Sequence, residues 1–150
     1  MIKALIFDFD GLIVETEGPI YQSWLEVYQS YGFEIALDRW VTIIGTSEGS
    51  FDPYQELERL AGKKLDWEAI DPRRRQREYE LVCQQPVLPG VRQLLTEGRA
   101  NGIKIGLASS SPASWVTGHL KRLNLLDSFD VIRTREDQPL ARRMPVRTPV

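Results

Sequence analysis

Three short runs of apolar residues predict buried strands. The runs cover residues 2–7, 103–108 and 129–132. Nearly continuous apolar runs of this length suit strands of a parallel sheet that helices cover. Residues 91–100 and 111–123 show helical periodicity on either side of the second run. Strands that alternate with helices predict an α/β fold with a Rossmann-like, parallel, doubly wound sheet.

A helical pattern fills the chain between the first strand and residue 85. Start and stop signals divide it into four helices: Pro19 and Gly32 bound the first, Asp38 opens the second, Asp52-Pro53 and Gly62 bound the third, and Asp71-Pro72 opens the fourth. No convincing strand pattern interrupts them. We therefore expect residues 15–85 to form a small helical cap inserted into the α/β domain.

The remaining residues form the α/β core and a tail. Residues 1–14 and 86–137 are assigned to the core, and Pro86, Pro89 and Gly90 mark the boundary where it resumes. Three strands are few for a doubly wound sheet, so the core is expected to be incomplete. Residues 138–150 hold three prolines, three arginines and no acidic residue, and they are expected to form an irregular tail.

Composition narrows the class of protein. The chain is 42% hydrophobic and 27% charged, with a formal net charge of -2, which argues against nucleic-acid binding. No apolar run approaches the ~20 residues that span a bilayer, so no membrane partner is expected. Cys83 is the one cysteine and fits a reducing compartment. We expect a soluble cytoplasmic protein.

The first candidate for chemistry is Asp8-Phe9-Asp10-Gly11, directly after the first predicted strand. Ligand sites of open α/β sheets lie at the carboxyl ends of strands. Two carboxylates suit Mg²⁺, and Gly11 gives the backbone freedom to turn away. The alternative is a turn with solvated aspartates, and the residues by themselves leave both readings open.

The second candidate is Ser109-Ser110-Ser111-Pro112, at the end of the second predicted strand and the start of a helix. A serine hydroxyl and main-chain N–H groups at a helix N-terminus can bind phosphate. Ser111 can instead be a plain N-cap before Pro112. Two such signals in order on successive strand ends favour a phosphate site.

Residues 7–17 and 103–111 resemble the first and second motifs of phosphatases of the haloacid dehalogenase superfamily, in the branch that includes β-phosphoglucomutase. The resemblance implies a Mg²⁺-dependent phosphatase of a small phosphorylated metabolite, such as a sugar phosphate, that works through an aspartyl-phosphate. Asp8 would be the nucleophile and Asp10 the general acid and base. Mg²⁺ would bind Asp8 and Asp10. Substrate-binding residues would be Ser109, Ser110, Gly11 and Thr16.

Two elements of that family are missing from the sequence. The family places a phosphate-binding lysine after the turn at Asp137, but no lysine follows Lys121, and Arg142 is no free substitute. An acidic pair that completes the Mg²⁺ ligands is also absent. We expect a truncated or frameshifted chain with impaired activity.

Alternative functions stay open. Glu48 and Ile20 stand where the mutases carry arginine and histidine, which favours a hydrolase over a phosphomutase. The chain can also be an inactive binding module, or it can be completed by a partner chain through self-association at an uncovered sheet edge.

Other residues receive structural interpretations. His119 is expected on a helix surface without a role, and Cys83 as a buried or half-buried thiol. The basic run from Arg73 to Arg77 is interpreted as a solvated helix face. Core positions are expected for the four tryptophans: Trp24, Trp40, Trp67 and Trp115.

Overall fold

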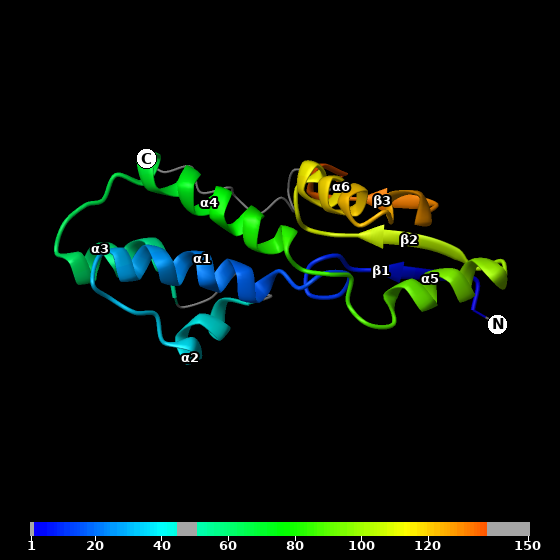
Figure 1. The fold of residues 1–150 in the computed structure, drawn as a ribbon, viewed down its shortest axis with the longest axis horizontal. Coiled ribbons are helices and arrows are strands. Elements are labelled where there is room, and N and C mark those ends of the chain that lie inside the picture. Colours follow the sequence, from blue (N-terminus) through cyan, green and yellow to red (C-terminus); the bar gives the residue numbers. More distant parts are fainter. Residues whose placement is uncertain (1, 45–50, 138–150) are drawn as a thin grey trace. The chain divides into compact units, whose positions relative to one another are not determined.

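The computed structural model describes residues 2–44 and 51–137. These residues contain a three-stranded parallel sheet of β1 (Ala4–Phe7), β2 (Lys104–Ala108) and β3 (Val131–Arg133), with β2 in the centre. The three arrowheads point the same way in Figure 1, so the carboxyl ends of the strands share one edge of the sheet. The predicted α/β fold with a parallel sheet is confirmed.

Contacts divide the described chain into two compact units. The sheet unit contains residues 2–16 and 82–137, and the helical unit contains residues 17–44 and 51–81. The predicted irregular tail and the segment around Glu48 lie outside the described residues.

One face of the sheet is covered by two helices, α5 (Val91–Ala100) and α6 (Ala113–Arg122). Alternate strand positions point into this core, which is built from Phe7, Ile105 and Leu107 on the strands and Val91, Leu95, Val116 and Leu120 on the helices. Both crossovers run in the same direction along the sheet, so right-handed connections place both helices on the same face. Ile6 and Val131 occupy the other face, and they are 76% and 46% exposed.

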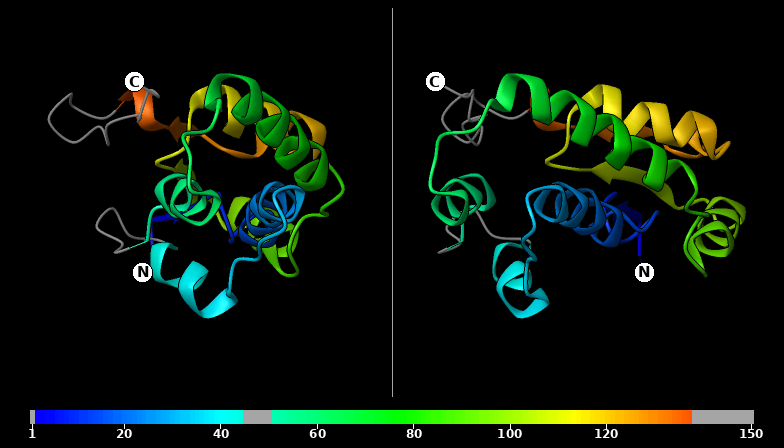
Figure 2. Two further views of the ribbon diagram at one scale, coloured as in Figure 1. Left: turned by 90° about the vertical axis from the view of Figure 1, so that its left-hand side faces the viewer. Right: turned by 60° about the vertical axis from the view of Figure 1, so that its left-hand side comes forward.

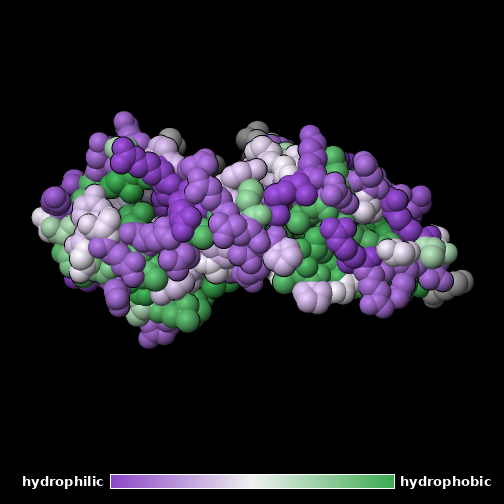
Figure 3. All heavy atoms as spheres, viewed as in Figure 1, coloured by the Kyte–Doolittle hydropathy of each residue, from purple (hydrophilic) through white to green (hydrophobic). Residues whose placement is uncertain are grey.

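The helical unit contains α1 (Glu17–Ser30), α2 (Leu37–Trp40), α3 (Pro53–Ala61) and most of α4 (Trp67–Cys83). Figure 2 gives two further views of these helices, with α1 in blue and the short α2 in cyan. Its core is aromatic, since the ring centroid of Tyr54 lies 4.6 Å from that of Trp24 and 4.8 Å from that of Trp67. Figure 3 shows apolar surface around α2. Leu37 and Val41, in and directly after this helix, are exposed.

Capping explains where the third and fourth helices begin. Asp52 accepts from the main-chain N–H groups of Tyr54 and Gln55 at 3.0 and 3.3 Å, as predicted for α3. The prediction for α4 was wrong, because this helix begins at Trp67 and contains Pro72. The missed signal is Asp66, whose Oδ1 accepts from the N–H of Ala69 at 3.2 Å.

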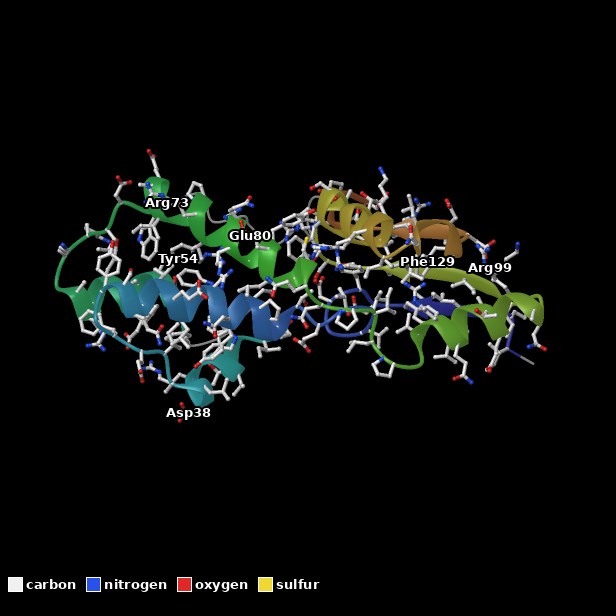
Figure 4. All side chains as sticks on the ribbon, viewed as in Figure 1. Asp38, Tyr54, Arg73, Glu80, Arg99 and Phe129 are labelled. Carbon is white, nitrogen blue, oxygen red and sulfur yellow. The ribbon has the colours of Figure 1, made fainter. Side chains whose placement is uncertain are left out.

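The basic run on α4 is only partly solvated. Arg73, labelled in Figure 4, is exposed, but Arg74 is buried, so the predicted solvated face was wrong there. Arg74 pairs with Asp71 at 3.0 Å and Glu78 at 2.5 Å, and its guanidinium lies 4.7 Å from the centroid of Trp24. Burial would raise the pKa of Asp71, but hydrogen bonding and the charge of Arg74 lower it overall.

Candidate active site

The site begins at the carboxyl end of β1. Asp8 is exposed, and its Oδ1 accepts from the main-chain N–H of Phe9 at 2.7 Å. Phe9 is fully buried in the core of the sheet unit. Gly11 has a φ of 69°, a left-handed conformation, and its N–H donates to the carbonyl of Val14 at 3.0 Å. The chain therefore turns sharply after β1 and leaves the Asp8 carboxylate facing solvent.

Both oxygens of the Asp10 carboxylate are held by side chains from beyond the end of β2. Ser111 Oγ donates to Oδ2 at 2.6 Å, and Ser109 Oγ lies 3.5 Å from the same oxygen. Trp115 Nε1 donates to Oδ1 at 3.0 Å. The structure thus brings together Asp10 and Ser109, which are 99 positions apart in the sequence.

Ser111 does not cap the helix that follows it. The cap position of α6 is Pro112, which makes no side-chain capping bond, and the hydroxyl of Ser111 is directed to Asp10 instead. The main-chain N–H of Ala113, at the start of α6, donates to Glu136 Oε2 at 2.9 Å. The N-cap interpretation of Ser111 was therefore wrong, and no local pattern in the sequence indicated its contact with Asp10.

The other predicted phosphate-binding residues differ in exposure. Ser109 is buried, and its hydroxyl accepts from the N–H of Ser111 at 3.0 Å. Ser110 is exposed, and its carbonyl accepts from Arg135 Nε at 3.0 Å. Thr16 is fully buried, and its hydroxyl has no hydrogen-bond partner among the described residues. Their proposed role in phosphate binding stays a prediction.

A turn after β3 reaches the same edge of the sheet. The N–H of Thr134 donates to Asp137 Oδ2 at 2.8 Å, which lowers the pKa of Asp137. Arg135 donates from its main-chain N–H to the carbonyl of Ser111 at 3.1 Å. The residues that follow β3 therefore hold the Ser110-Ser111 segment in place.

His119 is fully buried, so its predicted place on a helix surface was wrong. Its ring lies 6.2 Å from the ring of Phe9 and 4.4 Å from that of Trp115, measured between centroids. Burial, together with the charge of Arg122, lowers the pKa of His119 to about 4. The spacing of Trp115, His119 and Arg122 on one helix face was the available signal, and it was missed.

The acidic groups fit Mg²⁺ only as a partial ligand set. No group of three or more His, Cys, Asp or Glu side chains able to hold a metal occurs in residues 2–44 and 51–137. Mg²⁺ commonly binds one or two carboxylates and completes its shell with water and substrate phosphate. The exposed Asp8 suits this role, whereas three donors already engage the carboxylate of Asp10.

The two described hollows lie away from these residues. One, of about 560 Å³, lies between residues 86–93 and 122–124, and the other, of about 350 Å³, lies within the helical unit. Neither is lined by Asp8, Asp10 or Ser109. Among the described helices, none has the length and apolar character to cross a membrane.

A parallel α/β sheet with an inserted helical unit, and with carboxylates and serines at the strand ends, defines a Rossmann-like α/β protein. Comparison with known protein families identifies the family to which the chain belongs. The family model for haloacid dehalogenase-like hydrolases matches residues 5–143, and the chain belongs to this family.

Individual relatives agree with this assignment. The chain is 45% identical to YhcW of Bacillus subtilis (strain 168) over 137 residues, which are 91% of this chain and 62% of YhcW. It is 28% identical to hexitol phosphatase B of Escherichia coli (strain K12), covering 96% of this chain and 65% of that protein. The crystal structure of β-phosphoglucomutase from Clostridium difficile superposes with a TM-score of 0.60 and 28% identity, covering 92% and 64% of the two chains. The chain thus spans less than two thirds of each relative's length.

Proposed function

We propose that this chain is the nucleophile-bearing part of a Mg²⁺-dependent phosphatase that acts on a small phosphorylated metabolite, most simply a sugar phosphate. The observation that carries the proposal is the pairing of an exposed Asp8 with an Asp10 carboxylate held by Ser111 and Trp115. An exposed carboxylate can reach a phosphorus atom, and a fixed carboxyl group beside it can transfer a proton.

The proposed reaction has two displacements. An Asp8 oxygen attacks the phosphorus, the bond from phosphorus to the leaving oxygen breaks, and Asp10 gives its proton to that oxygen. Water then attacks the phosphorus of the aspartyl-phosphate and gives a proton to Asp10. The bond to Asp8 breaks and releases inorganic phosphate. Ser109 and the main-chain N–H of Ser110 would bind the phosphoryl oxygens.

Mg²⁺ would bind the Asp8 carboxylate and the main-chain carbonyl of Asp10. When bound, it supplies positive charge that offsets the repulsion between a phosphate dianion and a carboxylate nucleophile. The hard oxygen donors of the site are compatible with this ion.

Related proteins support a phosphorylated sugar as the substrate class. Hexitol phosphatase B is named for the phosphate of a sugar alcohol, and β-phosphoglucomutase, a similar protein with a different reaction, is named for a phosphorylated sugar. A phosphomutase is therefore the second candidate. Ile20 is half-buried and apolar, and it offers no charged group to a second phosphate. This favours hydrolysis over transfer between two positions of a sugar.

Two further parts of the proposal concern partners and compartment. β1 and β3 are both edge strands of the described sheet, and either edge could pair with a second chain. We propose self-association through these edges, to be tested by analytical ultracentrifugation; a strictly monomeric protein would exclude it. The half-buried free thiol of Cys83 is consistent with a reducing cytoplasm.

The test is phosphate release from p-nitrophenyl phosphate and a panel of sugar phosphates, with and without Mg²⁺. Asp8→Asn should abolish Mg²⁺-dependent release. Asp38→Asn is the matched control, because Asp38 is also exposed and also accepts from the next main-chain N–H at 2.7 Å. Release that is absent from the folded parent, or equal in parent and Asp8→Asn, would contradict the proposal.

A further inference from the structure

Three side chains on one face of α6 connect Asp10 to the end of α4. Trp115, His119 and Arg122 are spaced at i, i+4 and i+7, so they lie along the same side of the helix. Their contacts are continuous in space from Asp10 to residues 82–85, and all of them lie within the sheet unit.

The first contact orients the carboxyl group of Asp10. Trp115 Nε1 donates to Oδ1, while Ser111 donates to Oδ2, so rotation of the carboxyl group would break a hydrogen bond on either side. The indole in turn packs against the ring of His119, in an edge-to-face arrangement with an interplanar angle of 78° and 4.4 Å between the centroids. Since His119 is fully buried, the indole has a rigid support.

Arg122 fixes His119 in turn. Arg122 Nε lies 3.4 Å from Nδ1 of His119, which acts as the acceptor. The rest of the guanidinium donates to three main-chain carbonyls at the end of α4, those of Val82, Cys83 and Gln85, at 3.0 to 3.2 Å. Arg122 is therefore held in one conformation by acceptors on two sides.

We propose that Arg122 and His119 are positioning residues, which hold the indole of Trp115 so that it fixes the carboxyl group of Asp10 in the orientation for proton transfer. This inference rests on the proposed function of Asp10. Proton transfer depends on the direction of the carboxyl group, so a loosened indole should slow this step more than substrate binding.

The leaving group provides the kinetic test. p-Nitrophenolate leaves readily without a proton, whereas a sugar alkoxide needs one. Trp115→Phe and Arg122→Gln should lower kcat/KM on a sugar phosphate by about tenfold, part of the effect of general acid catalysis, and on p-nitrophenyl phosphate by less than about twofold. The ratio kcat/KM is compared because it covers only the steps up to departure of the leaving group, before the attack of water that also uses Asp10 on both substrates. The control is Arg92→Gln, because Arg92 also donates to a main-chain carbonyl, that of Leu123 at 2.7 Å, but does not belong to this network.

A second readout needs no catalysis. Nitrogen-15 NMR observes each indole N–H, and the Trp115 signal is assigned by its loss in Trp115→Phe. In Arg122→Gln the N–H of Trp115 should exchange with solvent about tenfold faster, while the signals of Trp24, Trp40 and Trp67 stay unchanged. His119→Asn, which removes the supporting ring, should do the same if Arg122→Gln fails to fold.

The outcomes separate the two proposals. Unchanged exchange at Trp115 in both Arg122→Gln and His119→Asn overturns the positioning role, whatever the activity. Equal losses of kcat/KM on both substrates indicate a merely structural role and also overturn it. A parent chain without Asp8-dependent activity contradicts the proposed function, and the exchange measurement then decides whether Arg122 still orders the indole.

Discussion

Ser111 donates its hydroxyl to Oδ2 of Asp10 at 2.6 Å, although 101 positions separate the two residues. The short distance is typical of a hydrogen bond from a hydroxyl to a carboxylate. It joins the turn after β1 to the turn after β2, because neighbouring parallel strands end at the same edge. The candidate site therefore depends on contacts that form only when the sheet is assembled.

The Ser111 contact should matter more for the reaction than its exposed neighbour does. Ser111→Ala removes one of the groups that fix Asp10, so we expect kcat on a sugar phosphate to fall about tenfold. Ser110→Ala keeps the main-chain N–H and should stay within about twofold of the parent. Steady-state kinetics of both variants check this, and an equal effect in the two would contradict a special role for Ser111.

Arg74 should be a main determinant of the stability of the helical unit. Arg74→Met leaves the half-buried Glu78 without its cation and the buried Asp71 with only the exposed Arg75, at 2.9 Å, which should lower the free energy of unfolding by about 3 kcal/mol. Arg73→Met is the matched control on an exposed position and should cost less than about 0.5 kcal/mol. Urea denaturation followed by tryptophan fluorescence measures both, and similar midpoints would show that the buried cation contributes little.

His119 should make the protein less stable in mild acid. In the folded protein its pKa is lowered to about 4, whereas a free histidine takes up a proton near pH 6.5. Between these values the unfolded chain binds more protons, so the free energy of unfolding falls as the pH falls. From pH 7 to 5 the loss should be about 2 kcal/mol, measured by urea denaturation at several pH values.

The chain has no other histidine, which makes the origin of this pH dependence testable. His119→Asn should be less stable than the parent at pH 7, because a buried ring is lost. Its stability should nevertheless change little between pH 7 and 5. A variant that keeps the slope of the parent would assign the effect to other groups.

Local signals in the sequence predicted much of the fold. The apolar runs located all three described strands within about two residues, and the Asp52 cap and Gly62 stop bounded α3 correctly. The start of α4 was missed because Asp71-Pro72 is also a good start signal. In the structure the earlier cap at Asp66 prevails, and the carboxylate of Asp71 binds Arg74 instead.

Long-range contacts explain what the sequence could not predict. His119 and Arg74 are polar residues on helices, for which exposure is the usual expectation. Both are buried because they contact partners that are distant in the sequence. The ring of His119 stacks against that of Phe9, and the guanidinium of Arg74 donates a hydrogen bond to Ser23. The strand-end position of Asp8 was readable from local pattern, but the donors to Asp10 were not.

The hydroxyl of Thr16 allows the effect of one group on stability to be compared with its effect on substrate binding. A buried hydroxyl without a partner is unfavourable, so Thr16→Val, which keeps the shape, should raise the free energy of unfolding by about 1 kcal/mol. Residues kept for ligand binding often cost stability in this way, so the same variant should raise KM for phosphorylated substrates about threefold or more.

Thr117→Val is the control, since the hydroxyl of Thr117 already donates to the carbonyl of Ala113 at 2.8 Å. Thermal melts and steady-state kinetics provide the two measurements. A gain in stability with an unchanged KM would remove Thr16 from the substrate-binding residues, and a loss of stability would show that its hydroxyl finds a water partner in solution.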